Sequence, residues 1–236
     1  MLQGKVALGM PPAAALRIGP PLAARIRQSY PEVMLSLRDG VSSLIQEWLI
    51  AGRIDLGVTY NATPVDGLEI VPPLRERAVL VGPPADSLAG EHEPIRLREI
   101  AGPPLIMPSL PHNNRRVLEE AAARHEVRLV IRAEVDSVAL TKVLVRDGQG
   151  YTILSHASVE DEASRGELSR RVIDSPPVFA DLSLVATKAA LGEPLKRHVA
   201  LELRRLLTEL CESGAWPGAT LTKPERVTVA QVNHST

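Results

Sequence analysis

The stretch Leu49-Ile50-Ala51-Gly52-Arg53-Ile54-Asp55-Leu56-Gly57-Val58 decides the fold, because it contains the end of one helix and the start of one strand. Apolar residues recur at helical spacing before Gly52, which predicts a helix that Ser42 or Ser43 caps and that the glycine ends. The alternation that follows predicts a strand over residues 54–59. A helix that leads directly into a strand is the second half of a strand–helix–strand unit.

The residues before this stretch supply the first half of that unit and an earlier unit. An apolar run closed by Gly9 predicts a strand, and a helix follows that Gly19-Pro20-Pro21 is expected to kink or restart before Pro31 ends it. Residues 33–37 predict the next strand. Parallel neighbours need crossover connections, so two such units in succession predict a mostly parallel sheet flanked by helices.

The chain after residue 60 repeats this alternation, which predicts a second α/β lobe. An apolar strand over 77–81 ends at Gly82-Pro83-Pro84, and a late strand at 179–186 precedes a helix that starts at Pro194. After Gly214-Ala215-Trp216-Pro217-Gly218 the sequence turns polar and shows little helical period, and we expect a flexible tail over 214–236. The second lobe is expected to contain strands at 105–107, 128–134 and 151–154 and helices at 113–125, at 136–146 and from Val159.

The composition is that of an ordinary globular protein, with 44% apolar residues, 3% aromatic residues and a formal net charge of -1. Because Lys and Arg do not outnumber Asp and Glu, we do not expect the chain to bind nucleic acid by itself. Cys211 is the single cysteine, which excludes an internal disulfide and a CxxC site. No secretory signal is visible and no apolar run approaches the ~20 residues that cross a bilayer, so we expect a cytoplasmic protein without a membrane partner.

Motifs of the common enzyme classes are missing from the sequence. There is no GxSxG, HExxH, Walker A or GxGxxG motif in the required context, and the six histidines are scattered without ligand spacing. We therefore expect no catalytic residue, no metal site and no cofactor.

The order and spacing of four stretches resemble the effector-binding domain of the LysR-type transcriptional regulators. The resemblance extends from residue 4 to about residue 212. The stretches that match are Gly4-Lys5-Val6-Ala7-Leu8-Gly9, Tyr30-Pro31-Glu32-Val33, the opening stretch at 49–58, and Leu144-Val145-Arg146-Asp147-Gly148-Gln149-Gly150-Tyr151.

This resemblance implies a two-lobed α/β fold of the type 2 periplasmic-binding-protein kind, with a mostly parallel sheet and flanking helices in each lobe. The chain leaves the first lobe, builds the second and returns. On this basis residues 1–81 and 187–213 form lobe I, residues 82–186 form lobe II, and residues 214–236 form the tail.

The resemblance also implies a function. Such a domain binds a small effector in the interlobe cleft, assembles as a homodimer or tetramer, and controls transcription. DNA is contacted only through an N-terminal winged helix-turn-helix, for which there is no room before Gly4.

Ligand sites in such folds lie where strands end and helices begin, because helix N-termini present free amides there. Each of these residues also has a plain structural explanation as a cap, turn or loop, and the prolines of the first turn offer no amide hydrogen. The candidate effector-binding residues are Met10, Pro12 and Ala13 in the first turn, Tyr60 and Asn61 in the second, Ser109, His112 and Asn113 in the third, and Ser137 and Ser155 in two further turns.

The candidate turns are rich in Pro, Ser, Thr and Asn and poor in firmly placed cations, so the expected effector is a small organic acid or amide. Two other functions stay open at this point. A solute-binding protein of a transporter would carry a signal sequence upstream, and an enzyme on the same bilobal fold would turn over the bound metabolite.

Overall fold

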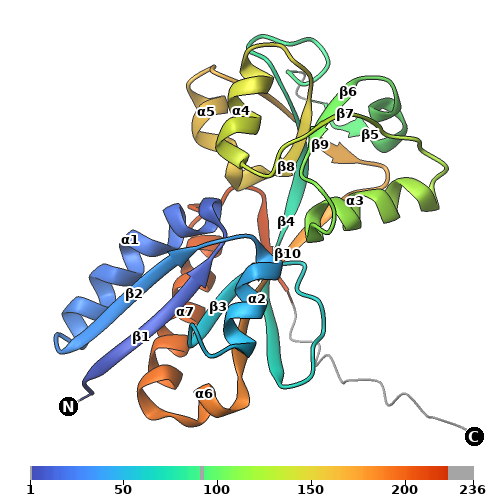
Figure 1. The fold of residues 1–236 in the computed structure, drawn as a ribbon. Helices are drawn as coiled ribbons and strands as arrows, with labels where there is room; N and C mark the ends of the chain where they lie inside the picture. Colours follow the sequence, from blue (N-terminus) through green and yellow to red (C-terminus); the bar gives the residue numbers. More distant parts are fainter. Residues whose placement is uncertain (1, 91–92, 223–236) are drawn as a thin grey trace, which may run out of the picture.

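The computed structural model describes residues 2–90 and 93–222, which fold into two α/β lobes (Figure 1). The first lobe begins with two strand–helix–strand units, as the sequence predicts. In this lobe β1 pairs in parallel with β2 and with β3. The elements of the two units are β1 (Gly4–Met10), α1 (Pro12–Ser29), β2 (Val33–Asp39), α2 (Ser42–Ile50) and β3 (Leu56–Tyr60).

Helix α1 runs without interruption through Pro20 and Pro21, so the expected restart at Gly19-Pro20-Pro21 is wrong. Its buried face repeats every four residues and includes Ile18, Leu22 and Ile26. Each proline removes one backbone hydrogen bond. Burial of the apolar stripe against the sheet holds the helix together across this gap.

The end of α2 follows the prediction, whereas its start does not. Gly52 has φ +65° and its amide donates to Leu49 O at 3.1 Å, as a glycine that ends a helix does. The N-cap is Val41, which makes no side-chain cap bond, so neither Ser42 nor Ser43 is the cap. Because Ser42 is already helical, its hydroxyl instead accepts the amide of Tyr60 at 3.0 Å.

Strand β4 (Leu68–Gly82) belongs to both lobes (Figure 1). Over residues 68–77 it pairs with β10 (Phe179–Thr187), and over residues 78–82 it pairs with two strands of the second lobe, all antiparallel. Since β10 also pairs with β3, we infer lobe boundaries near 77/78 and 178/179 in place of 81/82 and 186/187. The sequence of a continuous apolar strand does not change where its pairing partner changes, so this boundary could not be predicted.

In the second lobe the parallel ladder between β5 (Ile95–Arg96) and β9 (Ser169–Asp174) continues the sheet that contains β4, whereas β6 (Pro104–Met107) and β7 (Val130–Glu134) form a separate parallel pair. Alternate residues of β4 face opposite sides here, so Ala78 and Leu80 enter one apolar cluster while Val79 and Val81 enter another. Its elements are β5 (Ile95–Arg96), η1 (Leu97–Ala101), β6 (Pro104–Met107), α3 (Asn113–Arg124), β7 (Val130–Glu134), α4 (Val138–Arg146), β8 (Thr152–Ser155), η2 (His156–Ser158), α5 (Glu160–Ser164) and β9 (Ser169–Asp174).

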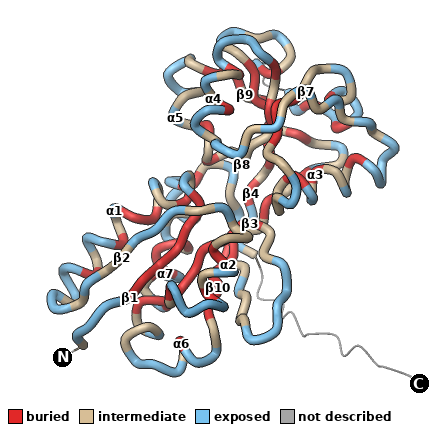
Figure 2. The backbone as a smooth tube through the Cα atoms, in the orientation of Figure 1, coloured by how far each residue is buried: buried red, intermediate tan, exposed pale blue. Residues whose placement is uncertain are grey.

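The chain then returns to the first lobe and closes its core. After α6 (Lys188–Gly192), helix α7 (Pro194–Glu212) buries Val199, Leu203 and Leu207 in the same cluster as the inner face of α1. Buried backbone follows β1, β3, β4 and β10 through the middle of the molecule (Figure 2). Among the described residues, no helix combines the length and the apolar character that crossing a membrane requires.

Residues 214–222 pack on the first lobe, which corrects the expectation that the flexible tail begins at residue 214. Strand β11 (Ala219–Leu221) pairs with β4. The Trp216 side chain is 1% exposed, and its Nε1 donates to Glu76 Oε2 at 3.2 Å. One large apolar ring that donates to a buried acceptor fixes a short segment that is rich in small residues. The remainder of the expected tail, 223–236, lies outside the described residues.

We expect Trp216→Ala to lower the free energy of unfolding by about 3–5 kcal/mol, because it opens a cavity and removes one of the two donors to the buried Glu76 Oε2. Urea denaturation followed by circular dichroism measures this. The exposed Leu221 of the same segment provides the control, and Leu221→Ala should cost no more than about 0.5 kcal/mol. Equal, small effects would show that the segment does not pack in solution.

Candidate functional site

A cavity of about 320 Å³ lies at the junction of the two lobes, and we call it the central cavity. Its wall is formed by the end of β3, the whole of β8 and the N-terminal ends of α1, α2, α3 and α4. Strand ends and helix starts therefore meet where the fold class leads one to expect a ligand. The sequence-predicted residues that line it are Pro12, Ala13, Tyr60, His112, Ser137 and Ser155.

Three buried polar atoms in the wall of the central cavity have no hydrogen-bond partner within the described part of the chain. They are Tyr60 Oη, His112 Nδ1 and Thr152 Oγ1. Buried polar groups are nearly always paired, and an unpaired one is costly. A small movement of these side chains would bring the three atoms within reach of a polar molecule in the cavity. The sequence analysis did not identify Thr152, which nothing in the sequence distinguishes from a structural strand threonine.

At the wall, the protein itself satisfies the charged groups of Arg115 and Asp136. The Arg115 guanidinium donates to Pro108 O at 2.7 Å and pairs with Glu119 and Glu134. Asp136 accepts the amide and hydroxyl of Ser109 at 2.8 and 2.5 Å, and these bonds lower the pKa of its carboxyl group. Ser109 is therefore engaged with Asp136 and does not line the cavity.

The start of α4 offers free backbone donors to the central cavity. Ser137 is its N-cap and accepts the Leu140 amide at 3.3 Å, as the sequence suggested. The amides of Val138 and Ala139, which both line the cavity, have no acceptor within the helix. Together with the helix dipole they favour a carboxylate. Helix α1 offers less, because Pro11 is its N-cap and Pro12 has no amide hydrogen.

Asn61 and Asn113 connect the lobes and do not line the cavity. Asn113 Nδ2 donates to the carbonyls of Tyr60 and Asn61 at 3.2 and 3.0 Å. Asn61 Nδ2 donates to Asn114 Oδ1 at 2.9 Å, and its Oδ1 accepts the Asp181 amide at 3.0 Å. These bonds, which we call the asparagine bridge, join α3 to β3. Met10 also stays outside the lining, because it is fully buried in the core of the first lobe.

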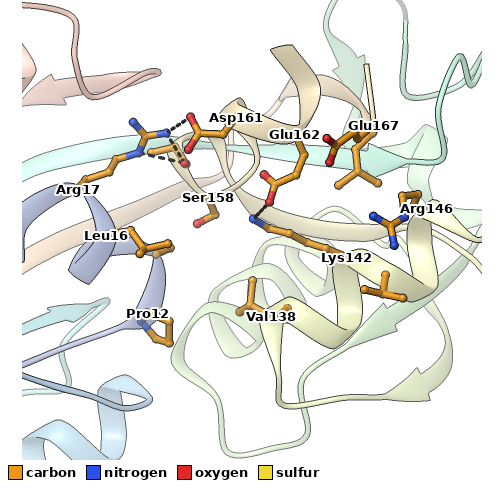
Figure 3. A pocket seen from close by; sticks show the side chains of 15 residues that line it. Pro12, Leu16, Arg17, Val138, Lys142, Arg146, Ser158, Asp161, Glu162 and Glu167 are labelled. Carbon is orange, nitrogen blue, oxygen red and sulfur yellow. Dashed lines mark hydrogen bonds and ion pairs between the residues drawn. The ribbon is translucent and has the colours of Figure 1, made fainter. Parts of the chain in front are cut away.

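A second cavity of the same volume lies beside α1 and α4, and we call it the side cavity (Figure 3). Its charged groups pair with one another: Arg17 contacts Asp161 at 3.3 Å and the Ala157 carbonyl at 2.9 Å, and Lys142 contacts Glu162 at 2.8 Å. Among the described residues, no unpaired buried side-chain atom lines it. The central cavity is therefore the better candidate for a ligand site.

Within residues 2–90 and 93–222, no group of three or more His, Cys, Asp or Glu side chains is placed to hold a metal ion. His112 is the titratable base of the central cavity. Burial lowers its pKa, and the nearby charge of Asp136 opposes this only in part.

This shift predicts a pH effect on stability. The folded state binds fewer protons than the unfolded state, whose histidine pKa is about 6.5, so the free energy of unfolding should fall as the pH drops through that value. His112→Gln should make the dependence between pH 7.5 and 5 shallower, by at most about 1.4 kcal/mol per pH unit. Urea titrations at several pH values measure this, with the exposed His125→Gln as control. Equal slopes in wild type and His112→Gln would contradict the assignment.

Comparison with known proteins places the chain among transcription regulators. Residues 1–208 match the family model of the LysR substrate binding domain. The chain is 27% identical over 222 residues to the HTH-type transcriptional regulator BbuR of Bordetella bronchiseptica, with 92% of this chain and 67% of BbuR covered. It is 29% identical to the nitrogen assimilation regulatory protein nac of Klebsiella aerogenes, with 78% of this chain and 59% of that protein covered. The chain thus spans roughly two thirds or less of the length of these relatives.

Solved structures show the same fold. The effector binding domain of QuiR in complex with shikimate aligns with a TM-score of 0.76 at 18% identity, covering 86% of this chain and 96% of that one. The Synechocystis CcmR regulatory domain in complex with 2-PG aligns with a TM-score of 0.74 at 23% identity, covering 87% and 97%. Since the family model covers residues 1–208, the chain belongs to the LysR family and carries its substrate-binding, effector-sensing domain.

Proposed function

We propose that the central cavity binds a small organic acid or amide and that its occupancy shifts the arrangement of the two lobes. The observation that carries this proposal is the set of unpaired atoms of Tyr60, His112 and Thr152 in the cavity wall. A polar ligand that satisfies them removes the cost of leaving them unpaired.

The chemistry of the wall supports an organic acid or amide over a strongly anionic ligand. The free amides of α4 suit one carboxylate, and the hydroxyls of Tyr60 and Thr152 both donate and accept. Asp39 and Asp136 add negative charge, and the guanidinium of Arg115 is already paired. QuiR, which shares the fold, was crystallised with shikimate, a small hydroxylated acid.

A ligand can change the arrangement of the lobes because the groups that it contacts belong to both of them. Tyr60 belongs to the first lobe, whereas His112 and Thr152 belong to the second. The lobes are also joined by the asparagine bridge and by Arg17, which donates to Ala157 O. A ligand that bonds to both lobes favours the arrangement that brings its partners together, and a coupling of about 1–3 kcal/mol is enough for regulation.

In the whole regulator, this change would reach DNA through a further, DNA-binding domain in the cytoplasm. The matched relatives are transcription regulators and not enzymes, so the transport and enzyme alternatives are not favoured.

A thermal-shift screen of small organic acids and amides should give a ligand, and Thr152→Val should weaken its binding about 5–30-fold in calorimetry. The substitution keeps the shape of the side chain and removes one hydrogen bond worth about 1–2 kcal/mol. Val143→Ala in the side cavity is the matched control and should leave the affinity unchanged. Loss of affinity in Val143→Ala but not in Thr152→Val would contradict the choice of cavity.

We also propose that the domain forms a homodimer through β2, with tetramers assembled through further domains. Among the described strands, β2 is an edge of the large sheet, and it exposes 63% of Met34 and 42% of Leu37. Unpaired edges with exposed apolar side chains favour association with another chain.

Met34→Lys should weaken the dimer at least about tenfold, because it places an unpaired charge in the interface. Sedimentation velocity over a concentration series measures this. Ile50→Lys, at an exposed apolar position of α2, is the control and should leave the dimer intact. A monomeric wild-type protein, or a dimer disrupted only by Ile50→Lys, would contradict the proposed interface.

A further inference from the structure

A fully buried carboxylate, Glu76, lies on β4 close behind the central cavity. Its Oε2 accepts two hydrogen bonds, from Trp216 Nε1 at 3.2 Å and from the Ala157 amide at 3.3 Å. Its Oε1 has no hydrogen-bond partner within the part of the chain that the structure describes. One oxygen is thus fixed by the C-terminal segment and by η2, and the other is available.

The hydroxyl of Tyr60 is a donor that can use this oxygen. Tyr60 lies opposite Leu182 of β10 and Glu76 lies opposite Ala180, so both side chains are on the same face of the sheet. Tyr60 Oη and Glu76 Oε1 are both buried there without a bond of normal geometry. Burial raises the pKa of Tyr60 and Glu76 raises it further, while the Tyr60 hydroxyl opposes the burial-induced rise in the pKa of Glu76. Ser155 and Arg17 are the other groups that face this hydroxyl.

The chemistry of the pair gives the direction of the bond between them. A carboxylate only accepts hydrogen bonds, whereas a phenol donates one and accepts two. Trp216 and Ala157 hold the carboxylate in place through Oε2, so a small movement of the Tyr60 hydroxyl is enough to form the bond to Oε1. Once its proton points toward Glu76, only the lone pairs of Tyr60 face the cavity.

We propose that Glu76 is a positioning residue that holds the Tyr60 hydroxyl as an acceptor, so that the central cavity selects effectors carrying a hydroxyl or N–H group at that end. This inference rests on the proposed function and narrows its ligand class. A ligand with only an acceptor at this position would face the lone pairs of Tyr60 without a hydrogen between them.

The contact can be tested without a ligand, by following the Glu76 carboxyl group with ¹³C NMR between pH 4 and 8. Its signal is assigned by its disappearance in Glu76→Gln. Tyr60→Phe removes a donor that stabilises the carboxylate, so the Glu76 midpoint should move to higher pH. Tyr30→Phe, at the far end of α1, is the control and should not move it. An unchanged midpoint in Tyr60→Phe would overturn the proposal.

The selectivity is tested by calorimetry with 3-hydroxybenzoate and with 3-methoxybenzoate, in which a methyl group replaces the donor hydrogen. Wild type should bind the hydroxy acid at least about tenfold more tightly. Tyr60→Phe should remove this preference, and Glu76→Gln should reduce it, because an amide can donate to Tyr60 and turn its proton toward the cavity. Equal binding of the two acids, or preference for the methoxy acid, by wild type would overturn the inference.

If neither acid binds, the screen of organic acids and amides decides the proposed function, and the titration alone decides whether Glu76 holds Tyr60. If both acids bind without preference, the proposed function stands and the role of Glu76 does not.

Discussion

The antiparallel ladder between β4 and β10 is the constraint on which the rest of the structure depends. One half of β4 pairs with β10 in the first lobe, and the other half pairs with β8 and β9 in the second. Because one strand belongs to both sheets, the ends of β3 and β8 must lie near each other, and the helices that border the junction must start there. The central cavity is thus a consequence of strand pairing, and its side chains only decide what it can hold.

The helix and strand pattern could be predicted from the sequence because the spacing of apolar residues reflects which face of each element is buried. Two errors of this prediction, in α1 and in the C-terminal segment, have the same physical origin. Helix α1 continues through Pro20-Pro21, and residues 214–222 are ordered around Trp216, because tertiary burial outweighs a local preference that points the other way. Sequence rules for a proline pair or for a C-terminal tail do not include the apolar core that packs against the segment.

The location of the site was more predictable than its contacts. The rule that ligands lie at strand ends and helix starts placed Pro12, Tyr60 and His112 at the cavity wall. The same rule also selected Asn61 and Asn113, whose amides bind partners across the lobe junction. A sequence shows which side chains carry donors and acceptors near a site, but pairing depends on three-dimensional neighbours. That is why Thr152, whose hydroxyl is unpaired, could not be found before the fold was known.

The contrast between paired and unpaired groups suggests how such a domain can respond to a ligand. The asparagine bridge and the contact of Arg17 with Ala157 join the lobes with a few hydrogen bonds, each worth about 0.5–1.5 kcal/mol. The unpaired atoms of His112 and Thr152 each cost about 1–3 kcal/mol while they lack a partner. The two energies are of similar size, so a ligand that satisfies these atoms can change the balance between lobe arrangements. A cavity whose polar groups were all paired internally, as in the side cavity, would have less to gain from a polar ligand. The unpaired atoms that raise the free energy of the protein without a ligand therefore also allow a bound ligand to shift the arrangement of the lobes.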